Sequence, residues 1–127
     1  MKIKIENVIS EGDETRVKFS SDYGCSSALW ASDEPTCGEF YDIEFEIDDE
    51  LVWGESISTT TRDGDTIALE EGAFVIVGTV LKLEEDGRLS IGLGDSVILL
   101  DVENMPEDTF GLVECRTTEV KLYSTNL

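Results

Sequence analysis

Apolar and polar residues alternate with a period of two along much of this chain. The clearest stretch is 40–48, where odd-numbered apolar residues interleave with even-numbered acidic ones. This period is typical of a β-strand with one buried face. The apolar set is Tyr41, Ile43, Phe45 and Ile47, and the acidic set is Asp42, Glu44, Glu46 and Asp48.

Two shorter alternating stretches, Lys2–Ile5 and Arg16–Phe19, flank the polar residues 11–14. This arrangement predicts an N-terminal β-hairpin with its turn at 11–14. Further along, two Thr-rich stretches within 56–70 flank a turn at 62–65. They predict two weaker strands.

Residues 73–102 predict a long hairpin, and the chemistry of its loop sets the register. A two-residue loop at Asp86-Gly87 would mix polar and apolar residues across the strand pair. A three-residue loop, 85–87, puts the apolar residues on one face, with Gly87 in the left-handed region. This register places Leu83 opposite Leu89 and Leu81 opposite Ile91.

The remaining stretches complete an all-β pattern. Residues 97–100 predict a strand buried on both faces, and 112–123 predict one last strand with a bulge near Thr117-Thr118. Residues 20–38 are irregular, with room for one helical turn at 27–31, and a loop covers 103–109. The fold expected is a single small Greek-key barrel or sandwich, OB-like or SH3-like, with at most one short helical turn. It would occupy 1–127 as a single acidic domain.

The charge of the chain limits its partners. The 127 residues include 29 acidic and 9 basic ones, which gives a formal net charge of −20. Small soluble domains usually carry a net charge of magnitude about 2–8. So large an excess of acid repels nucleic-acid phosphate and anionic lipid, so we expect no nucleic-acid partner and no membrane partner.

Catalytic and metal-binding patterns are weak. The chain contains no histidine, which removes the commonest general base and the commonest metal ligand. The acidic groups at 48–50 and 63–65 fall where turns are expected and lack EF-hand spacing. We therefore expect no enzyme activity, no cofactor and no metal site.

Cysteine usage indicates the compartment. Cys25, Cys37 and Cys115 form no C-x-x-C pair, and the start MKIKIENV has no apolar signal core. These features favour reduced thiols and a cytoplasmic location. A disulfide between Cys25 and Cys37 is the alternative if the protein is exported by another route.

Cross-strand pairing with cations could explain the row of acidic side chains along 40–48, here called the acid row. Four cations on the N-terminal hairpin could neutralise it if the strands lie side by side. These cations are Lys2, Lys4, Arg16 and Lys18. The long stretch from Phe19 to Thr61 has no such internal balance, because it holds eleven acidic residues, seven of the ten aromatics and no lysine or arginine.

Acidic residues interleaved with aromatics favour a surface that binds a basic protein. We therefore expect a non-catalytic acidic module, most concretely an immunity-type inhibitor of a basic partner such as a nuclease toxin, of unknown oligomeric state. An accessory or small-ligand-binding barrel is the alternative, and an acidic surface adapted to high salt is a third. Strand phase predicts a buried Trp53, whereas Trp30 lies in an irregular stretch. The candidate partner-binding residues are Trp30, Asp33, Glu34, Asp48, Asp49, Glu50, Trp53 and Glu55.

Overall fold

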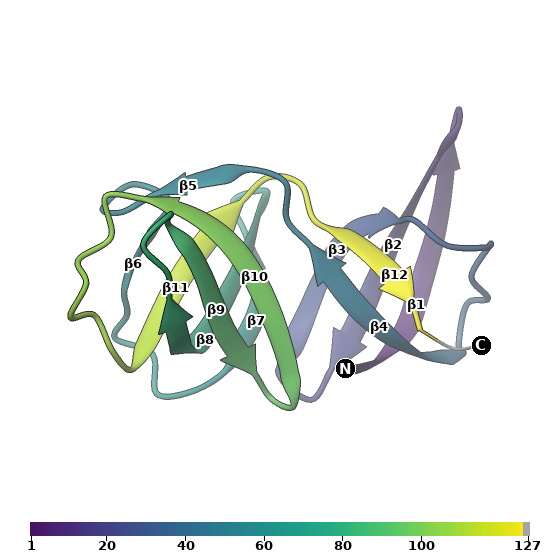
Figure 1. The fold of residues 1–127 in the computed structure, drawn as a ribbon. Helices are drawn as coiled ribbons and strands as arrows, with labels where there is room; N and C mark the ends of the chain where they lie inside the picture. The colour runs from purple at the N-terminus through teal and green to yellow at the C-terminus, as the bar shows by residue number, and fades with distance from the viewer. Residues whose placement is uncertain (126–127) are drawn as a thin grey trace.

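The computed structural model describes residues 1–125, which form twelve β-strands and contain no helix (Figure 1). No helix in this part of the chain is long and apolar enough to cross a membrane. The strands are β1 (Lys2–Glu11), β2 (Glu14–Ser21), β3 (Gly24–Trp30), β4 (Phe40–Glu46), β5 (Glu50–Val52), β6 (Ile57–Thr59), β7 (Thr66–Glu70), β8 (Ala73–Leu83), β9 (Arg88–Leu93), β10 (Ser96–Glu103), β11 (Leu112–Thr117) and β12 (Lys121–Ser124).

Five of these strands close a small barrel. Their order is β12-β4-β1-β2-β3, and β12 also pairs with β3, so the sheet returns on itself. The β12–β3 pairing is parallel and the other pairings in the ring are antiparallel. The order β4-β1-β2-β3 is that of a Greek key, with the long return connection at 31–39. The expected all-β Greek-key barrel is therefore confirmed.

The other strands extend this sheet outside the barrel. The connection runs from β3 to β7 through Gly24 and Ile67, and the sheet continues in the order β7-β8-β9-β10-β5. Strand β11 pairs with β8 and with β6. Figure 1 shows β1–β4 and β12 gathered near the two termini, and β5, β6 and β8–β11 at the other end of the molecule.

The hydrophobic core runs through both groups of strands. Phe19 of the barrel packs against Phe74 of β8 with ring centroids 6.0 Å apart, and Phe45 of β4 packs against the same Phe74 at 6.3 Å. The alternation along β4 is confirmed, because Ile43 and Ile47 are buried and the acidic residues between them are exposed. Burial of one face thus explains the period of two in the sequence.

The N-terminal hairpin and the three-residue loop of the long hairpin are confirmed. Leu83 pairs with Leu89, and the amide of Glu84 donates to the carbonyl of Arg88 at 2.9 Å. Gly87 has φ of 91°. The expected pairing of Leu81 with Ile91 is wrong, because a bulge between Val80 and Lys82 shifts the register. Val80 pairs with Ile91 instead, and the extra residue Leu81 turns outward, 56% exposed.

Two expectations about local burial and helicity are also wrong. The helical turn for which 27–31 had room does not form. Gly24–Trp30 is strand β3, because pairing of 24–29 with β2 and of Leu29 and Trp30 with β12 satisfies its backbone and overrides the local composition. Residues 97–100 are not buried on both faces. Ile98 and Leu100 are buried, but Val97 is 61% exposed and Leu99 is 51% exposed, since the outer face of β10 has no layer over it among the described residues.

The last strand expected at 112–123 is two strands in different parts of the molecule. Strand β11 pairs with β8 and β6, whereas β12 pairs with β4 and β3. The bulge expected near Thr117-Thr118 is wrong, because β11 ends at Thr117 without a register shift and the chain leaves one group of strands for the other. The change of apolar phase there reflects two different buried faces.

Candidate acidic binding cleft

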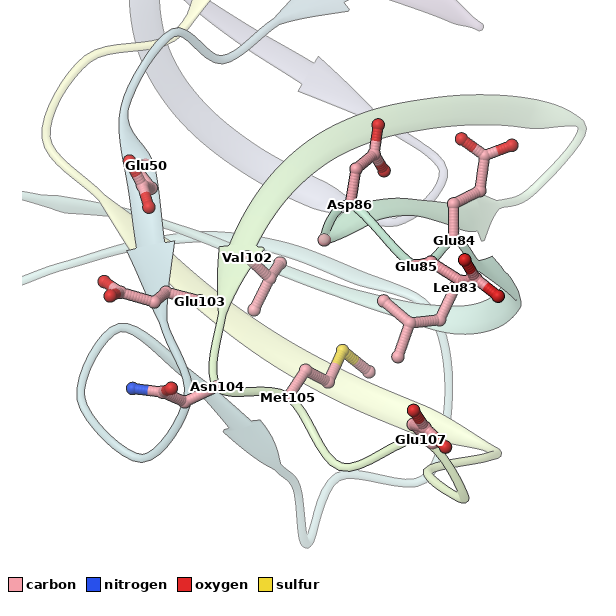
Figure 2. A pocket seen from close by; sticks show the side chains of 11 residues that line it. Glu50, Leu83, Glu84, Glu85, Asp86, Val102, Glu103, Asn104, Met105 and Glu107 are labelled. Atoms are coloured by element: carbon pink, nitrogen blue, oxygen red, sulfur yellow. The ribbon is translucent and has the colours of Figure 1, made fainter.

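A cleft of about 530 Å³ lies where the β8–β9 turn meets the end of β10 and the loop after it. Figure 2 shows apolar side chains in its centre, with carboxylates on both sides. The apolar side chains are Leu83, Val102 and Met105, and the carboxylates are Glu50, Glu84, Glu85, Asp86, Glu103 and Glu107; Gly87 and Asn104 complete the lining.

The turn on one side of the cleft is held by short hydrogen bonds. The carbonyl of Gly87 accepts from the amide of Val102 at 2.9 Å, which ties the turn to β10. Asp86 accepts from the amide of Arg88 at 3.0 Å through Oδ1. Asn104, with φ of 64°, lies where the chain turns out of β10. The walls therefore rest on backbone contacts, and most of the carboxylates are left for a ligand.

The lining of the cleft is strongly acidic. It includes six carboxylate side chains and no lysine or arginine. Lys82, which does not line the cleft, pairs with Glu84 at 3.5 Å, and Arg88 pairs with Asp101 at 3.0 Å. Carboxylates around an apolar floor suit a lysine or arginine side chain, because its methylene stem packs on the floor while its head receives hydrogen bonds.

Glu50 is the residue from the expected partner-binding set that lines this cleft. Trp30 is buried, 6% exposed, and packs edge-on against Tyr41 with centroids 5.1 Å apart. Its Nε1–H donates to the carbonyl of Asp33 at 2.6 Å. Trp30 is therefore part of the core, and Asp33 and Glu34 are exposed in the loop beside it.

The remaining expected residues are divided between internal contacts and solvent. Asp48 binds Lys121 Nζ at 2.9 Å, and Asp49 accepts from the Thr117 hydroxyl at 2.9 Å. Trp53 is half-buried and packs against the core, so it faces the side that its strand phase predicted but is not buried as expected. Glu55 is exposed in the turn after it.

The cross-strand pairing expected for the acid row of β4 is found in part. Strand β1 lies beside β4, with Lys2 opposite Asp42, and the Lys2 ammonium lies 5.1 Å from the centre of the Phe40 ring. Arg16 pairs with Glu119 instead. At the other end of the row, Lys121 of β12 binds Asp48 and Glu46, at 2.9 and 3.9 Å.

A charge network absent from the sequence predictions joins β7, β11 and the 60–65 loop. Arg62 donates to both oxygens of Glu70 at 2.8 Å and to Glu114 at 2.9 Å, and Arg116 reaches Glu70 at 2.8 Å. Hydrogen bonds from Arg62 and then Arg116 hold the pKa of Glu70 below its usual value. The alternation of Glu114 and Arg116 along β11 is the sequence signal that both point to one face.

Thiols and carboxylates do not gather into a reactive or metal-binding group in the part that the structure describes. The three cysteines are free, and burial raises the pKa of the Cys115 thiol to about 12. Within 1–125, no three Cys, Asp or Glu side chains are grouped to hold a metal ion. Asp65 instead accepts from the amide of Gly94 at 2.7 Å.

Neither Trp30 nor Trp53 lines the acidic cleft. Comparisons with protein-family models, with curated proteins and with solved structures give no match for this chain.

Proposed function

We propose that this protein is a non-catalytic module that binds a basic protein, in the manner of an immunity-type inhibitor that covers the cationic active site of a nuclease toxin. The observation that carries the proposal is the acidic cleft, whose lining includes six carboxylates and no basic residue. A lysine or arginine from the partner would enter it with its stem against Leu83, Val102 and Met105.

The net charge of −20 supports the same partner class at long range. Opposite charges steer encounter and can raise association rates by about 10–10³-fold at low salt. The cleft then supplies the short-range contacts, because a carboxylate can accept two hydrogen bonds from a guanidinium. Charge thus acts on the rate of encounter, and the cleft fixes where the partner binds.

The test compares two triple variants with the same change in net charge. The cleft variant carries Glu50→Lys, Glu85→Lys and Glu103→Lys. The control variant carries Glu11→Lys, Asp13→Lys and Glu14→Lys at the exposed β1–β2 turn. Each protein is immobilised, and lysate of the producing cells is passed over it at low and at near-physiological salt. Retained proteins are identified by mass spectrometry, and each purified candidate is assayed for nuclease activity with and without this protein.

The expected result is a basic protein retained by the wild type and by the control variant but lost from the cleft variant at near-physiological salt. Its nuclease activity should fall when the wild-type protein is added. Equal retention by both variants would mean that general charge attraction, and not the cleft, explains the binding. Retention of no basic protein at either salt concentration would contradict the proposal.

A further inference from the structure

A second groove runs between β4 and β10, and its lining shares no residue with that of the acidic cleft. It consists of a cleft of about 610 Å³ and a neighbouring one of about 330 Å³. The two share Glu44 and Phe45 of β4 and Val97 of β10, so they form one continuous channel. The Cα atoms of β4 and β10 approach within 8 Å, but the two strands do not pair.

The edge of β10 that faces away from β9 is open along most of its length. Strand β9 pairs with Ser96–Asp101 on one side, whereas β5 pairs with Asp101–Glu103 alone on the other. The amide of Val102 points toward β9, because it donates to Gly87. Peptide groups alternate between the two edges of an antiparallel strand, so those of Val97 and Leu99 point to the open edge.

Strand β4 is open on the corresponding side. Strand β1 covers Phe40–Asp42, and Ile43 exchanges hydrogen bonds with Met1 on that side. Strand β12 pairs with 43–46 on the opposite side. By the same alternation, Phe45 directs its peptide groups to the side of β1, where no strand of the described chain pairs with it. An extended segment would therefore meet open backbone along the edge of β10. Because neighbouring strands lie about 4.8 Å apart, it can lie only where β4 and β10 are more than about 9.6 Å apart, and not at their closest approach.

The side chains of the groove combine apolar surface with acid. Val97 is 61% exposed, Leu99 is 51% exposed and Tyr123 is 38% exposed, and Phe45 is half-buried between them and the core. The acidic residues are Glu44, Glu46, Asp48, Asp95 and Asp101. Arg88 and Lys121 neutralise part of this charge through their pairs with Asp101 and Asp48, and the N-terminal ammonium of Met1 adds one further positive charge. Acid still exceeds base along the groove.

We propose that this groove binds an extended, basic segment of a partner protein, which pairs as an added strand with the open edge of β10. Strand addition uses main-chain hydrogen bonds for affinity and alternate side chains for specificity. One set of side chains would rest on Phe45, Val97 and Leu99, and the basic set would reach Glu44 and Asp95.

A second copy of this chain does not suit the groove, because each copy carries a net charge of −20 and the groove itself is acidic. Like charges brought together across an interface are destabilising. A basic strand has the opposite charge, and its alternation of basic and apolar residues matches the surface. This proposal does not rest on the acidic cleft, and either can hold without the other.

The probe is a blocked nine-residue peptide of alternating lysine and valine. Its controls are the same peptide methylated on every second backbone nitrogen, made in both phases, which keeps the charge but blocks strand pairing. The test variant is Leu99→Lys, and the matched control is Leu69→Lys, because Leu69 of β7 is 49% exposed and lies outside the groove. Binding is measured by calorimetry, and amide hydrogen exchange is followed by NMR.

The peptide should bind the wild type and the Leu69→Lys variant equally, and the Leu99→Lys variant about tenfold more weakly, a change of about 1.4 kcal/mol. The amides of Val97 and Leu99 should exchange more slowly in the complex. At least one methylated peptide should lose about tenfold in affinity. Equal binding of all three peptides would overturn the proposal, because charge attraction alone would then explain it.

The cleft variant with Glu50→Lys, Glu85→Lys and Glu103→Lys separates this proposal from the first. If the groove is the site, this variant binds the peptide within about threefold of the wild type, since the remaining effect is long-range charge. If the cleft variant loses the peptide while Leu99→Lys keeps it, the peptide occupies the acidic cleft and the strand-addition proposal is wrong. Unchanged exchange at Val97 and Leu99 in a saturated complex would also overturn it.

Discussion

Replacement of Gly87 by alanine tests the turn that carries one wall of the acidic cleft. Gly87 has φ of 91°, and a Cβ built there would lie 2.6 Å from the carbonyl oxygen of Val102. A left-handed conformation costs a non-glycine residue about 1–2 kcal/mol. The contact with backbone must also be relieved by movement, and the hydrogen bond from Val102 to Gly87 at 2.9 Å is the nearest bond at risk. Its loss adds about 1 kcal/mol.

The free energy of unfolding should therefore fall by about 2–3 kcal/mol in the Gly87→Ala variant, when the backbone strain and the lost hydrogen bond are combined. Gly72→Ala is the matched control, since Gly72 has φ of 80° but no atom within 4 Å of its Cβ position. That variant should lose about 1–2 kcal/mol, from backbone strain alone. Gly87→Val should be less stable than Gly87→Ala, because a β-branched side chain resists positive φ more strongly.

The measurement is urea-induced unfolding followed by tryptophan fluorescence and by circular dichroism, with the slope of free energy against urea compared across variants. Equal slopes are needed for the comparison, because a changed slope indicates a change in the surface exposed on unfolding. Equal destabilisation by Gly87→Ala and Gly72→Ala would refute the reasoning, because it would leave no cost for the contact between the turn and β10.

Three further outcomes are expected. The free energy of unfolding of the wild type, measured by denaturation at a series of pH values, should fall relative to that of a Cys115→Val variant by about 1.4 kcal/mol per pH unit between pH 9 and 12. The reason is that the thiol ionises near pH 9 in the unfolded chain but stays protonated in the folded chain, where its pKa is about 12. NMR titration should give Glu70 a pKa below 4.5, and this pKa should be higher in an Arg62→Gln variant. The stability that this carboxylate contributes is present above pH 4.5 and is lost as pH falls through its lower folded pKa. The melting temperature at pH 7 should rise as salt is increased from about 10 mM to 0.5 M, because screening weakens repulsion at a net charge of −20; a fall would contradict this account.

The local pattern of apolar and polar residues was sufficient to predict where most strands lie and which of their faces is buried. Alternation along 40–48 located β4 and its buried face, and the loop chemistry at 85–87 located the left-handed Gly87. Both are short-range properties, since pleating and turn geometry depend on neighbouring residues. The bulge that displaces Leu81 could not be predicted from the sequence, because it depends on the strands that pair with β8. Strand β7 pairs with residues 73–77 of β8, and β9 pairs with residues 79–83.

The candidate surfaces depended on tertiary structure. The sequence showed an excess of acid and placed it in the stretch without lysine or arginine, but of the residues selected there Glu50 alone lines the cleft. The other carboxylates of the cleft come from the turn at 84–86 and from 103–107, which β10 and β5 bring beside Glu50 by parallel pairing. Charge and alternation are properties of the chain itself, whereas the convergence of distant carboxylates and the open edge of β10 depend on strand pairings that a single sequence does not encode locally.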